Sequence, residues 1–213
     1  MYKKAISAAI LLLACLITGQ AMASPFSANI GWNSEYIFRG IPQEKSSAFG
    51  GLDLEAGGFY LGAWGADVGE GLEIDYYGGY NLEVGDFTFG VGGTLYTYTD
   101  DFDDNYQEYN LSAGWKWLTF SAAIGSYDNF DGPKLDYQFY SIKAEYNGFY
   151  GLVGTFDDDF DGTYYEAGYG NTLTFKETDL FDYSFAVIYS DSTLLGGDSE
   201  TNIVLTLSKT FDF

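Results

Sequence analysis

The chain has 213 residues, of which 31 are acidic and 9 are basic, and its formal net charge is −22 at pH 7. A charge of this size and sign disfavours nucleic acid and other anionic surfaces as partners. Histidine is absent, which excludes catalysis and metal binding through imidazole, and an aromatic content of 20% argues against an acidic disordered chain.

The first residues have the features of a secretory signal peptide. Two lysines in residues 1–4 precede an apolar stretch over residues 5–18, and Ala21-Met22-Ala23 is an A-x-A cleavage site. The apolar stretch is shorter than the roughly 20 residues that a membrane-spanning helix needs. We therefore predict a signal peptide over residues 1–23, cleaved before Ser24. The alternatives are a retained N-terminal anchor and lipoprotein processing at Cys15.

The rest of the chain alternates between apolar and polar residues with a period of two, the pattern of strands with two different faces. In residues 87–98, for example, Phe89 and Val91 alternate with Thr88 and Gly90. The pattern predicts twelve strands in one domain, residues 24–213, over about 26–39, 48–56, 58–66, 71–80, 87–98, 106–116, 118–127, 135–146, 149–156, 163–175, 182–190 and 200–213.

The predicted connections alternate in length. Short turns are expected at Gly57, at Lys116-Trp117 and at Asn147-Gly148, the last being a type I′ hairpin signal. Longer acidic loops are expected over 99–105, 127–134, 157–162 and 191–198. Short turns on one side and long loops on the other are typical of outer-membrane barrels. The segment 176–181 does not fit, because it is longer than a short turn.

Alternation alone does not decide which face points outward, and a water-soluble barrel remains the alternative. Three features favour an antiparallel transmembrane β-barrel of about twelve strands. The chain ends on Phe213 with other apolar residues on the same face, which resembles the signal read by the barrel-insertion machinery. Gly, Ser and Thr are frequent on the polar faces, as in a narrow lumen. Aromatic residues concentrate near strand ends and suit the interfacial girdles of a membrane barrel, namely Tyr36, Phe38, Phe87, Tyr98, Tyr127, Tyr146, Phe149 and Tyr189.

Three blocks of sequence stand out, at residues 34–43 (SEYIFRGIPQ), 58–65 (GFYLGAWG) and 73–80 (EIDYYGGY). They resemble a bacterial family classed as TorF-type porins, formerly described as conserved hypothetical proteins, and the resemblance is diffuse after residue 80. It implies a β-barrel with a pore in the outer membrane of a Gram-negative bacterium, in contact with lipid and lipopolysaccharide. The family offers no defined substrate or catalytic residue to carry over.

Charged residues on the polar faces are expected to line the lumen, because a charge facing lipid is unfavourable. The first four predicted strands contribute an acidic wall, and acidic rings favour cations in a pore. Arg39, the only arginine, is expected to hold Glu35 or Asp53 bidentately. In the alternative, ion pairs plug the lumen. The predicted lumen residues are Glu35, Arg39, Asp53, Glu55, Glu73, Asp75, Glu108, Lys143, Glu145 and Glu166, with Lys116 on the same faces.

The loop at 157–162 contains the first half of a calcium-binding pattern, with Asp157, Asp159 and Asp161 as candidate ligands. The glutamate expected at position 168 is Gly168, so a solvated acidic loop is the alternative. No other cofactor is expected, although carboxylates on external loops suit Ca²⁺ or Mg²⁺ shared with lipopolysaccharide phosphates.

The function that these features favour is passive diffusion of small solutes, with a preference for cations, across the outer membrane. The alternative is a non-conducting structural or surface-interaction barrel. An enzyme is not expected, because no feature distinguishes a catalytic carboxylate pair from the other acidic residues.

The mature protein is predicted to begin at Ser24, because signal peptidase cleaves after an A-x-A site. N-terminal sequencing of the protein purified from membranes tests this directly. A mature N-terminus at Cys15 with attached lipid would instead establish lipoprotein processing.

Overall fold

A computed structural model describes residues 25–213 as a closed barrel of twelve antiparallel strands. Each strand pairs with its neighbours in the sequence, and β1 pairs with β12 to close the sheet. The predicted signal peptide and its cleavage site lie outside the described residues. The strands are β1 (Phe26–Phe38), β2 (Ile41–Ala56), β3 (Phe59–Asp67), β4 (Leu72–Val84), β5 (Phe87–Tyr98), β6 (Tyr106–Trp115), β7 (Leu118–Tyr127), β8 (Leu135–Tyr146), β9 (Phe149–Asp158), β10 (Gly162–Phe175), β11 (Thr178–Ser190) and β12 (Glu200–Asp212), and one short helix, α1 (Ser192–Leu195), precedes β12.

The twelve-strand prediction is confirmed, and two connections are shorter than predicted. β2 begins at Ile41, because Arg39 and Gly40 form a two-residue turn with φ values of 48° and 82°. β11 begins at Thr178, because Lys176 and Glu177 form another such turn, with φ values of 46° and 66°. Positive φ at both central residues is the mark of the type I′ turn, whose twist matches that of the strands it joins.

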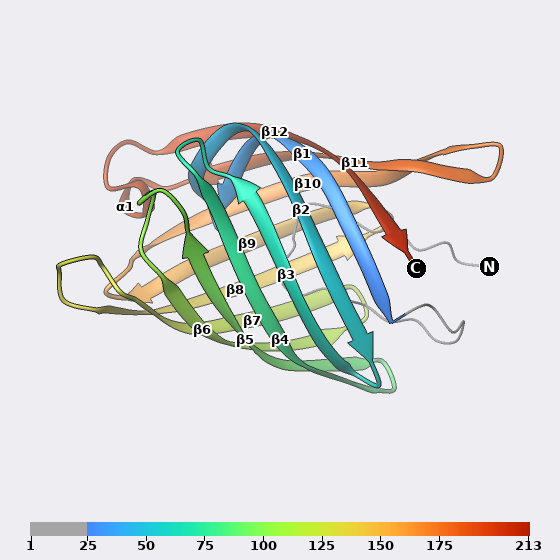
Figure 1. Ribbon diagram of the computed structural model, residues 1–213, viewed down its shortest axis with the longest axis horizontal. Coiled ribbons are helices and arrows are strands. Elements are labelled where there is room, and N and C mark those ends of the chain that lie inside the picture. Colours follow the sequence, from blue (N-terminus) through green and yellow to red (C-terminus); the bar gives the residue numbers. More distant parts are fainter. Residues whose placement is uncertain (1–24) are drawn as a thin grey trace.

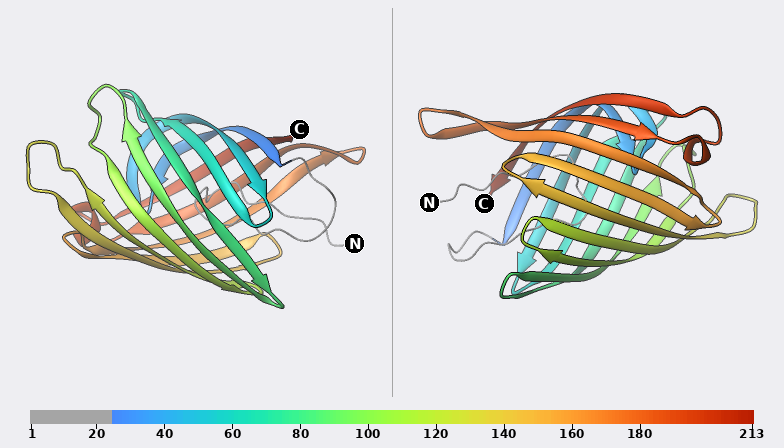
Figure 2. Two further views of the ribbon diagram at one scale, coloured as in Figure 1. Left: turned by 60° about the horizontal axis from the view of Figure 1, so that its bottom comes forward. Right: turned by 180° about the vertical axis from the view of Figure 1, so that it is seen from behind.

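The two ends of the barrel differ. One end, here called the turn end, carries five two-residue connections, at 57–58, 85–86, 116–117, 147–148 and 176–177, together with the start of β1 and the C-terminus. The opposite end, the loop end, carries the longer connections and α1 (Figure 1). This is the asymmetry that the sequence predicted. The β10–β11 hairpin extends beyond the other short turns (Figure 2), and residues 170–181 form no ladder pair with β9 or β12.

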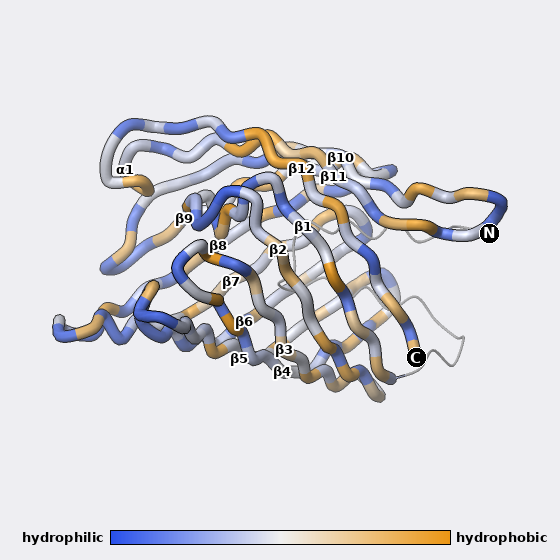
Figure 3. Tube along the Cα trace, turned by 45° about the horizontal axis from the view of Figure 1, so that its top comes forward, coloured by the Kyte–Doolittle hydropathy of each residue, from blue (hydrophilic) through white to orange (hydrophobic). Residues whose placement is uncertain are grey.

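The outer face of the barrel is apolar. Large hydrophobic side chains from every strand point outward, and the exposed fraction reaches 72% at Ile203 and 78% at Tyr109. Hydrophilic and hydrophobic residues alternate along the strands (Figure 3). A protein surrounded by water places such side chains inside, so we expect lipid to cover this face. Within residues 25–213 no helix is long and apolar enough to cross a membrane.

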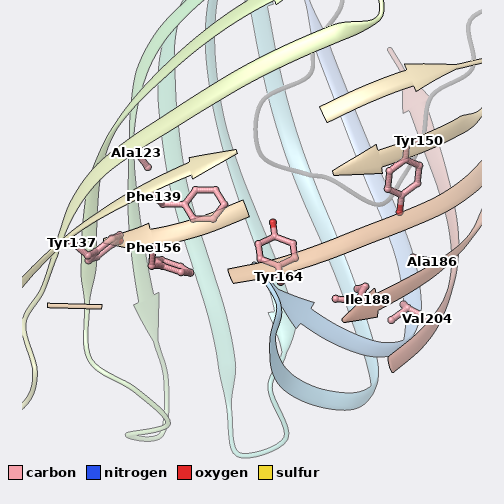
Figure 4. Close-up of a cluster of buried hydrophobic side chains, with 9 residues drawn as sticks. All are labelled: Ala123, Tyr137, Phe139, Tyr150, Phe156, Tyr164, Ala186, Ile188 and Val204. Atoms are coloured by element: carbon pink, nitrogen blue, oxygen red, sulfur yellow. The ribbon is translucent and has the colours of Figure 1, made fainter. Parts of the chain in front are cut away.

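The inner face has a polar side and an apolar side. The polar side comes from β4 to β6, where Glu73, Asp75, Glu108 and Asn110 are all buried. The apolar side comes from β7 to β12 (Figure 4), and its buried side chains are Ala123, Tyr137, Phe139, Tyr150, Phe156, Tyr164, Ala186, Ile188 and Val204. The interior is therefore asymmetric, with carboxylates facing a largely aromatic and aliphatic wall.

The loop-end part of the β1–β2 hairpin leaves the barrel wall. β1 pairs with β12 only as far as Asn33, and β2 pairs with β3 only from Phe49 onward. Residues 34–48, here called the inner hairpin, form ladder pairs only within the β1–β2 hairpin and none with β12 or β3. A register shift between Tyr36 and Ile37 marks a β-bulge, and bulges bend a strand and redirect its side chains. The bulge accompanies the departure of this segment from the wall.

A substitution that places a charged side chain on the outer face tests whether lipid or water surrounds the barrel. Val91→Arg, in the middle of β5, should lower the free energy of unfolding in lipid vesicles by about 2–4 kcal/mol, because arginine at mid-depth loses its hydration. Val84→Arg is the matched control beside the 85–86 turn and should cost about 0–1 kcal/mol. Urea titration followed by tryptophan fluorescence measures both costs. Equal costs at the two positions would contradict a lipid-covered outer face.

Candidate functional site

The centre of the lumen contains an ion pair between the inner hairpin and the opposite wall. Arg39 lies in the turn of the inner hairpin, and Glu108 lies on β6. The guanidinium donates from Nη1 to Glu108 Oε1 at 2.6 Å and from Nη2 to Oε2 at 2.9 Å. The Glu108 side chain is fully buried and that of Arg39 is 11% exposed. Such bidentate pairing fixes orientation as well as charge.

Both partners of this pair have further contacts that hold them in place. Glu108 also accepts hydrogen bonds from the hydroxyls of Tyr96 and Tyr137, at 3.0 and 2.8 Å. The guanidinium carbon lies 4.2 Å from the ring centroid of Phe139 on β8. Cation–π contact of this kind stabilises a desolvated guanidinium. We call this arrangement the Arg39–Glu108 latch.

The rest of the inner hairpin contacts strands all around the barrel. Tyr36 donates its hydroxyl to Glu73 on β4 at 2.5 Å, and Phe38 packs edge-on against Tyr96 on β5 at 5.5 Å. The carbonyl of Gly40 accepts a hydrogen bond from Ser190 Oγ on β11 at 2.5 Å. These strands are not neighbours of β1 and β2 in the wall, so the inner hairpin must lie across the lumen.

Gly40 is suited to the tip of the inner hairpin by its lack of a side chain. A Cβ atom there would lie 2.6 Å from Tyr164 Cβ and 2.9 Å from a Leu194 methyl group, and the φ of 82° is itself unfavourable for other residues. The tip therefore fits closely between β10 and α1.

An aromatic layer covers the inner hairpin at the loop end. The ring of Tyr106 stacks on that of Tyr127 at 4.3 Å, and the ring of Tyr137 stacks on that of Phe160 at 4.9 Å. Asp103 accepts hydrogen bonds from both Tyr106 and Tyr127, at 2.9 and 2.7 Å. These four rings, here called the aromatic cap, belong to the same packed cluster as Ile37 and Ile41 of the inner hairpin.

A cavity of about 320 Å³ lies between the inner hairpin and the turn end. Toward the loop end its lining stops at Phe38, Arg39 and Phe139, and toward the turn end it includes Lys116 and Trp117 of the β6–β7 turn. Trp117 is 51% exposed, so the lining reaches the surface at the turn end. We call this space the lumen cavity.

Four carboxylates line the lumen cavity, namely Glu35, Asp75, Glu145 and Glu166. Glu145 forms an ion pair with Lys143, and Glu166 accepts a hydrogen bond from the Tyr150 hydroxyl at 2.5 Å. Within residues 25–213, Glu35, Asp75 and Glu166 form no ion pair. Arg39 and Lys116 also line the cavity, but each is paired with a carboxylate that lies outside the lining. Arg39 pairs with Glu108, and Lys116 pairs with Asp86. The cavity therefore carries an excess of negative charge.

The structure separates the predicted lumen residues into three groups. Glu35, Arg39, Asp75, Lys143, Glu145 and Glu166 line the cavity, together with Lys116. Glu73 and Glu108 also point inward, but each binds the inner hairpin instead. Asp53 accepts hydrogen bonds from Tyr77 and Asn29, and Glu55 lies near the end of β2, so neither belongs to the cavity lining.

Three sequence expectations need correction. Arg39 pairs with Glu108, not with Glu35 or Asp53. Tyr36 and Phe38 were expected in an interfacial girdle on the outer face, yet both lie inside the barrel, because the inner hairpin leaves the wall. Tyr127 belongs to the aromatic cap, and the Tyr98 ring packs edge-on against Tyr106 of that cap.

The candidate metal ligands of the β9–β10 loop do not converge. Asp159 accepts a hydrogen bond from the Asp136 backbone N–H at 2.9 Å, and Asp161 accepts one from the Gly162 N–H at 2.7 Å. Asp157 lies on β9 opposite Gln138. In the described part of the chain, no group of three carboxylates has the geometry to hold a metal ion.

Sequence reasoning missed Trp64, Phe139 and Tyr164 as lining residues of the cavity. Each lies at an inward position of its strand and could have been assigned by extending the period-two register.

The contribution of the Arg39–Glu108 latch can be measured by a double-mutant cycle. Glu108→Gln keeps the hydrogen-bond acceptor but leaves Arg39 buried without a counter-charge, so the free energy of unfolding should fall by about 3–5 kcal/mol. Adding Arg39→Met removes the second charge and should restore most of that loss. Urea titration of the three variants gives the values, and a double variant as unstable as Glu108→Gln would contradict a buried ion pair.

The family described as "Bacterial protein of unknown function (Gcw_chp)" matches residues 18–182, and a search of curated proteins found no match. The KdgM porin shares 9% identity with a TM-score of 0.58, over 88% of this chain and 99% of that one. A structure from work on the in-meso crystallization of membrane proteins shares 7% identity with a TM-score of 0.61, over 88% and 83%. At these identities the likeness shows the barrel fold alone. The family match covers most of the chain, which therefore belongs to the Gcw_chp family of bacterial proteins.

Proposed function

We propose that this protein is an outer-membrane porin through which small solutes, preferentially cations, diffuse passively, and that the inner hairpin closes its loop end at rest. The proposal accords with the apolar outer face, with the barrel fold shared with the KdgM porin, and with the resemblance to TorF-type porins. It makes the protein a channel and not an enzyme, in the outer membrane of a Gram-negative bacterium.

The observation that carries the proposal is the way in which the lumen is blocked. A cavity of about 320 Å³ leads from the turn end to the inner hairpin. Residues 34–48 form ladder pairs only within the β1–β2 hairpin, so the inner hairpin can move without breaking the ladders to β12 and β3 that close the barrel. Side-chain contacts hold it in the lumen, chiefly the Arg39–Glu108 latch. A blockage of this kind is reversible.

The preference for cations rests on the charge of the cavity lining. Glu35, Asp75 and Glu166 line the cavity and form no ion pair within residues 25–213. Acidic side chains around a narrow pore attract cations, and screening by salt is weaker there than at an exposed surface. Cations should therefore enter the turn end more readily than anions.

A second candidate function is a non-conducting barrel with a permanently closed lumen. The observation that favours it is the number of contacts made by the latch. Arg39 has a bidentate partner and lies over the Phe139 ring, and the aromatic cap lies next to this arrangement. In this case the protein would serve as a structural or surface-interaction element, and its acidic loops would share divalent ions with lipopolysaccharide.

Single-channel recording in a planar bilayer separates the two functions. In potassium chloride, the wild type should show brief and infrequent openings, because the latch must break before ions pass. Arg39→Met/Glu108→Gln removes the latch without leaving a buried charge. Its open probability should therefore be at least about tenfold higher, which corresponds to a loss of about 1.4 kcal/mol from the free energy that favours the closed state. Absence of current from both proteins would establish the non-conducting barrel.

The same recordings under a salt gradient give the ion selectivity. The wild type should pass K⁺ more readily than Cl⁻, and Glu35→Gln/Glu166→Gln should move the reversal potential toward zero, because two cavity charges are lost while size and hydrogen bonding are kept. Glu177→Gln, in the turn of the projecting β10–β11 hairpin, removes a charge far from the cavity and is the control. Anion selectivity of the wild type would refute the assigned role of these carboxylates.

A further inference from the structure

Asp75 is a buried carboxylate without a full set of partners. It lies on β4, is 3% exposed and lines the lumen cavity. Its Oδ1 atom accepts no hydrogen bond, and the residue forms no ion pair within residues 25–213. Glu73, two residues away, is also buried but accepts the Tyr36 hydroxyl. A buried carboxylate with an unused acceptor is costly unless something supplies a donor.

Trp64 is the cross-strand neighbour of Asp75, and it has a hydrogen-bond donor without an acceptor. It pairs with Asp75 in the β3–β4 register, is 7% exposed and also lines the lumen cavity. Its indole Nε1–H finds no acceptor. Directly opposite residues of an antiparallel pair have Cβ atoms about 4.5–5.5 Å apart. An unused acceptor and an unused donor thus lie side by side on the wall of one cavity.

The surroundings hold Trp64 in position. The Tyr36 ring packs edge-on against it at 5.6 Å, and the Phe49 ring lies 5.7 Å away. The inner hairpin therefore forms part of the site, because Tyr36 belongs to it and donates to Glu73 at the same time. A rigid indole next to a buried carboxylate is an arrangement that recognises a cation by charge and by contact with an aromatic face.

The other charges of the cavity favour a positively charged ligand. Lys143 is paired with Glu145 and Arg39 with Glu108, so these bases are already neutralised. Glu35 and Glu166 add acidic charge without an ion-pair partner in the described chain. A cation in the cavity would thus meet carboxylates that have no basic partner.

We propose that the lumen cavity binds a small organic ammonium ion that carries an oxygen atom close to its nitrogen. The ammonium group donates to Asp75 Oδ1, and the ligand oxygen accepts the Trp64 Nε1–H. A volume of about 320 Å³ is at the small end of ligand pockets and suits a molecule of the size of an amino sugar or an amino alcohol. The ligand enters from the turn end, so the inner hairpin need not move. This inference names the solute class of the proposed channel and rests on that proposed function.

Titration calorimetry of the purified barrel in detergent tests the site with a matched pair of probes. Glucosamine and glucose have the same ring and differ at one carbon, where the first carries an ammonium group and the second a hydroxyl. Glucosamine should bind and glucose should give no measurable heat. Asp75→Asn should weaken glucosamine binding by about tenfold or more, because a charge-assisted hydrogen bond is lost. Glu177→Gln removes one charge from the projecting turn and should bind as the wild type does.

A second variant keeps the test decisive if Asp75→Asn folds poorly. Trp64→Phe keeps an aromatic ring and removes only the indole donor, and it should also weaken glucosamine binding. Circular dichroism and heat-modifiable gel mobility report whether each variant is folded. Equal binding of the two sugars, no binding of either, or unchanged binding in folded Asp75→Asn would overturn the inference. Because calorimetry needs no current, glucosamine binding by a non-conducting protein would overturn the proposed transport function and leave the site intact.

Discussion

The bidentate pair between Arg39 and Glu108 is the interaction on which the rest of the lumen depends. It joins the tip of the β1–β2 hairpin to β6, across the barrel, and it is buried between the Phe139 ring and the hydroxyls of Tyr96 and Tyr137. A buried ion pair contributes little net stability compared with apolar packing. Removing one partner, however, lowers the free energy of unfolding strongly, because the other charge stays buried without a counter-charge. Its main effect here is to allow one position of the inner hairpin.

The size of the barrel explains why an internal element is present. About eight strands enclose an interior that wall side chains can fill, and wider barrels leave space. This barrel has twelve strands, and residues 34–48 occupy part of the additional volume. The inner hairpin and the aromatic cap fill the loop end, whereas the turn end keeps the lumen cavity. One segment of β1 and β2 therefore decides which end of the lumen is filled and which end keeps a cavity.

The strands were predictable from the sequence because each depends on a local pattern. Period-two alternation located all twelve, and two-residue turn signals such as Asn147-Gly148 located several connections. The partner of Arg39 was not predictable in the same way, because Glu108 is 69 residues away and the contact crosses the lumen. Residues 34–39 belong to the first predicted strand even though they leave the wall, so Tyr36 and Phe38 were assigned to an aromatic girdle on the outer face. The register shift between Tyr36 and Ile37 depends on backbone geometry that no residue type reveals.

We propose that the inner hairpin, held inside the lumen, blocks conduction. Phe38 on the inner hairpin and Tyr96 on β5 have ring centroids 5.5 Å apart, and the chain has no cysteine after Cys15. Cysteines in place of these two residues can therefore be joined by a short, reducible thiol cross-linker, and conductance can be recorded before and after reduction in one bilayer. The account predicts no current while the bridge is intact and openings once it is reduced. Undiminished current through the bridged protein would contradict it.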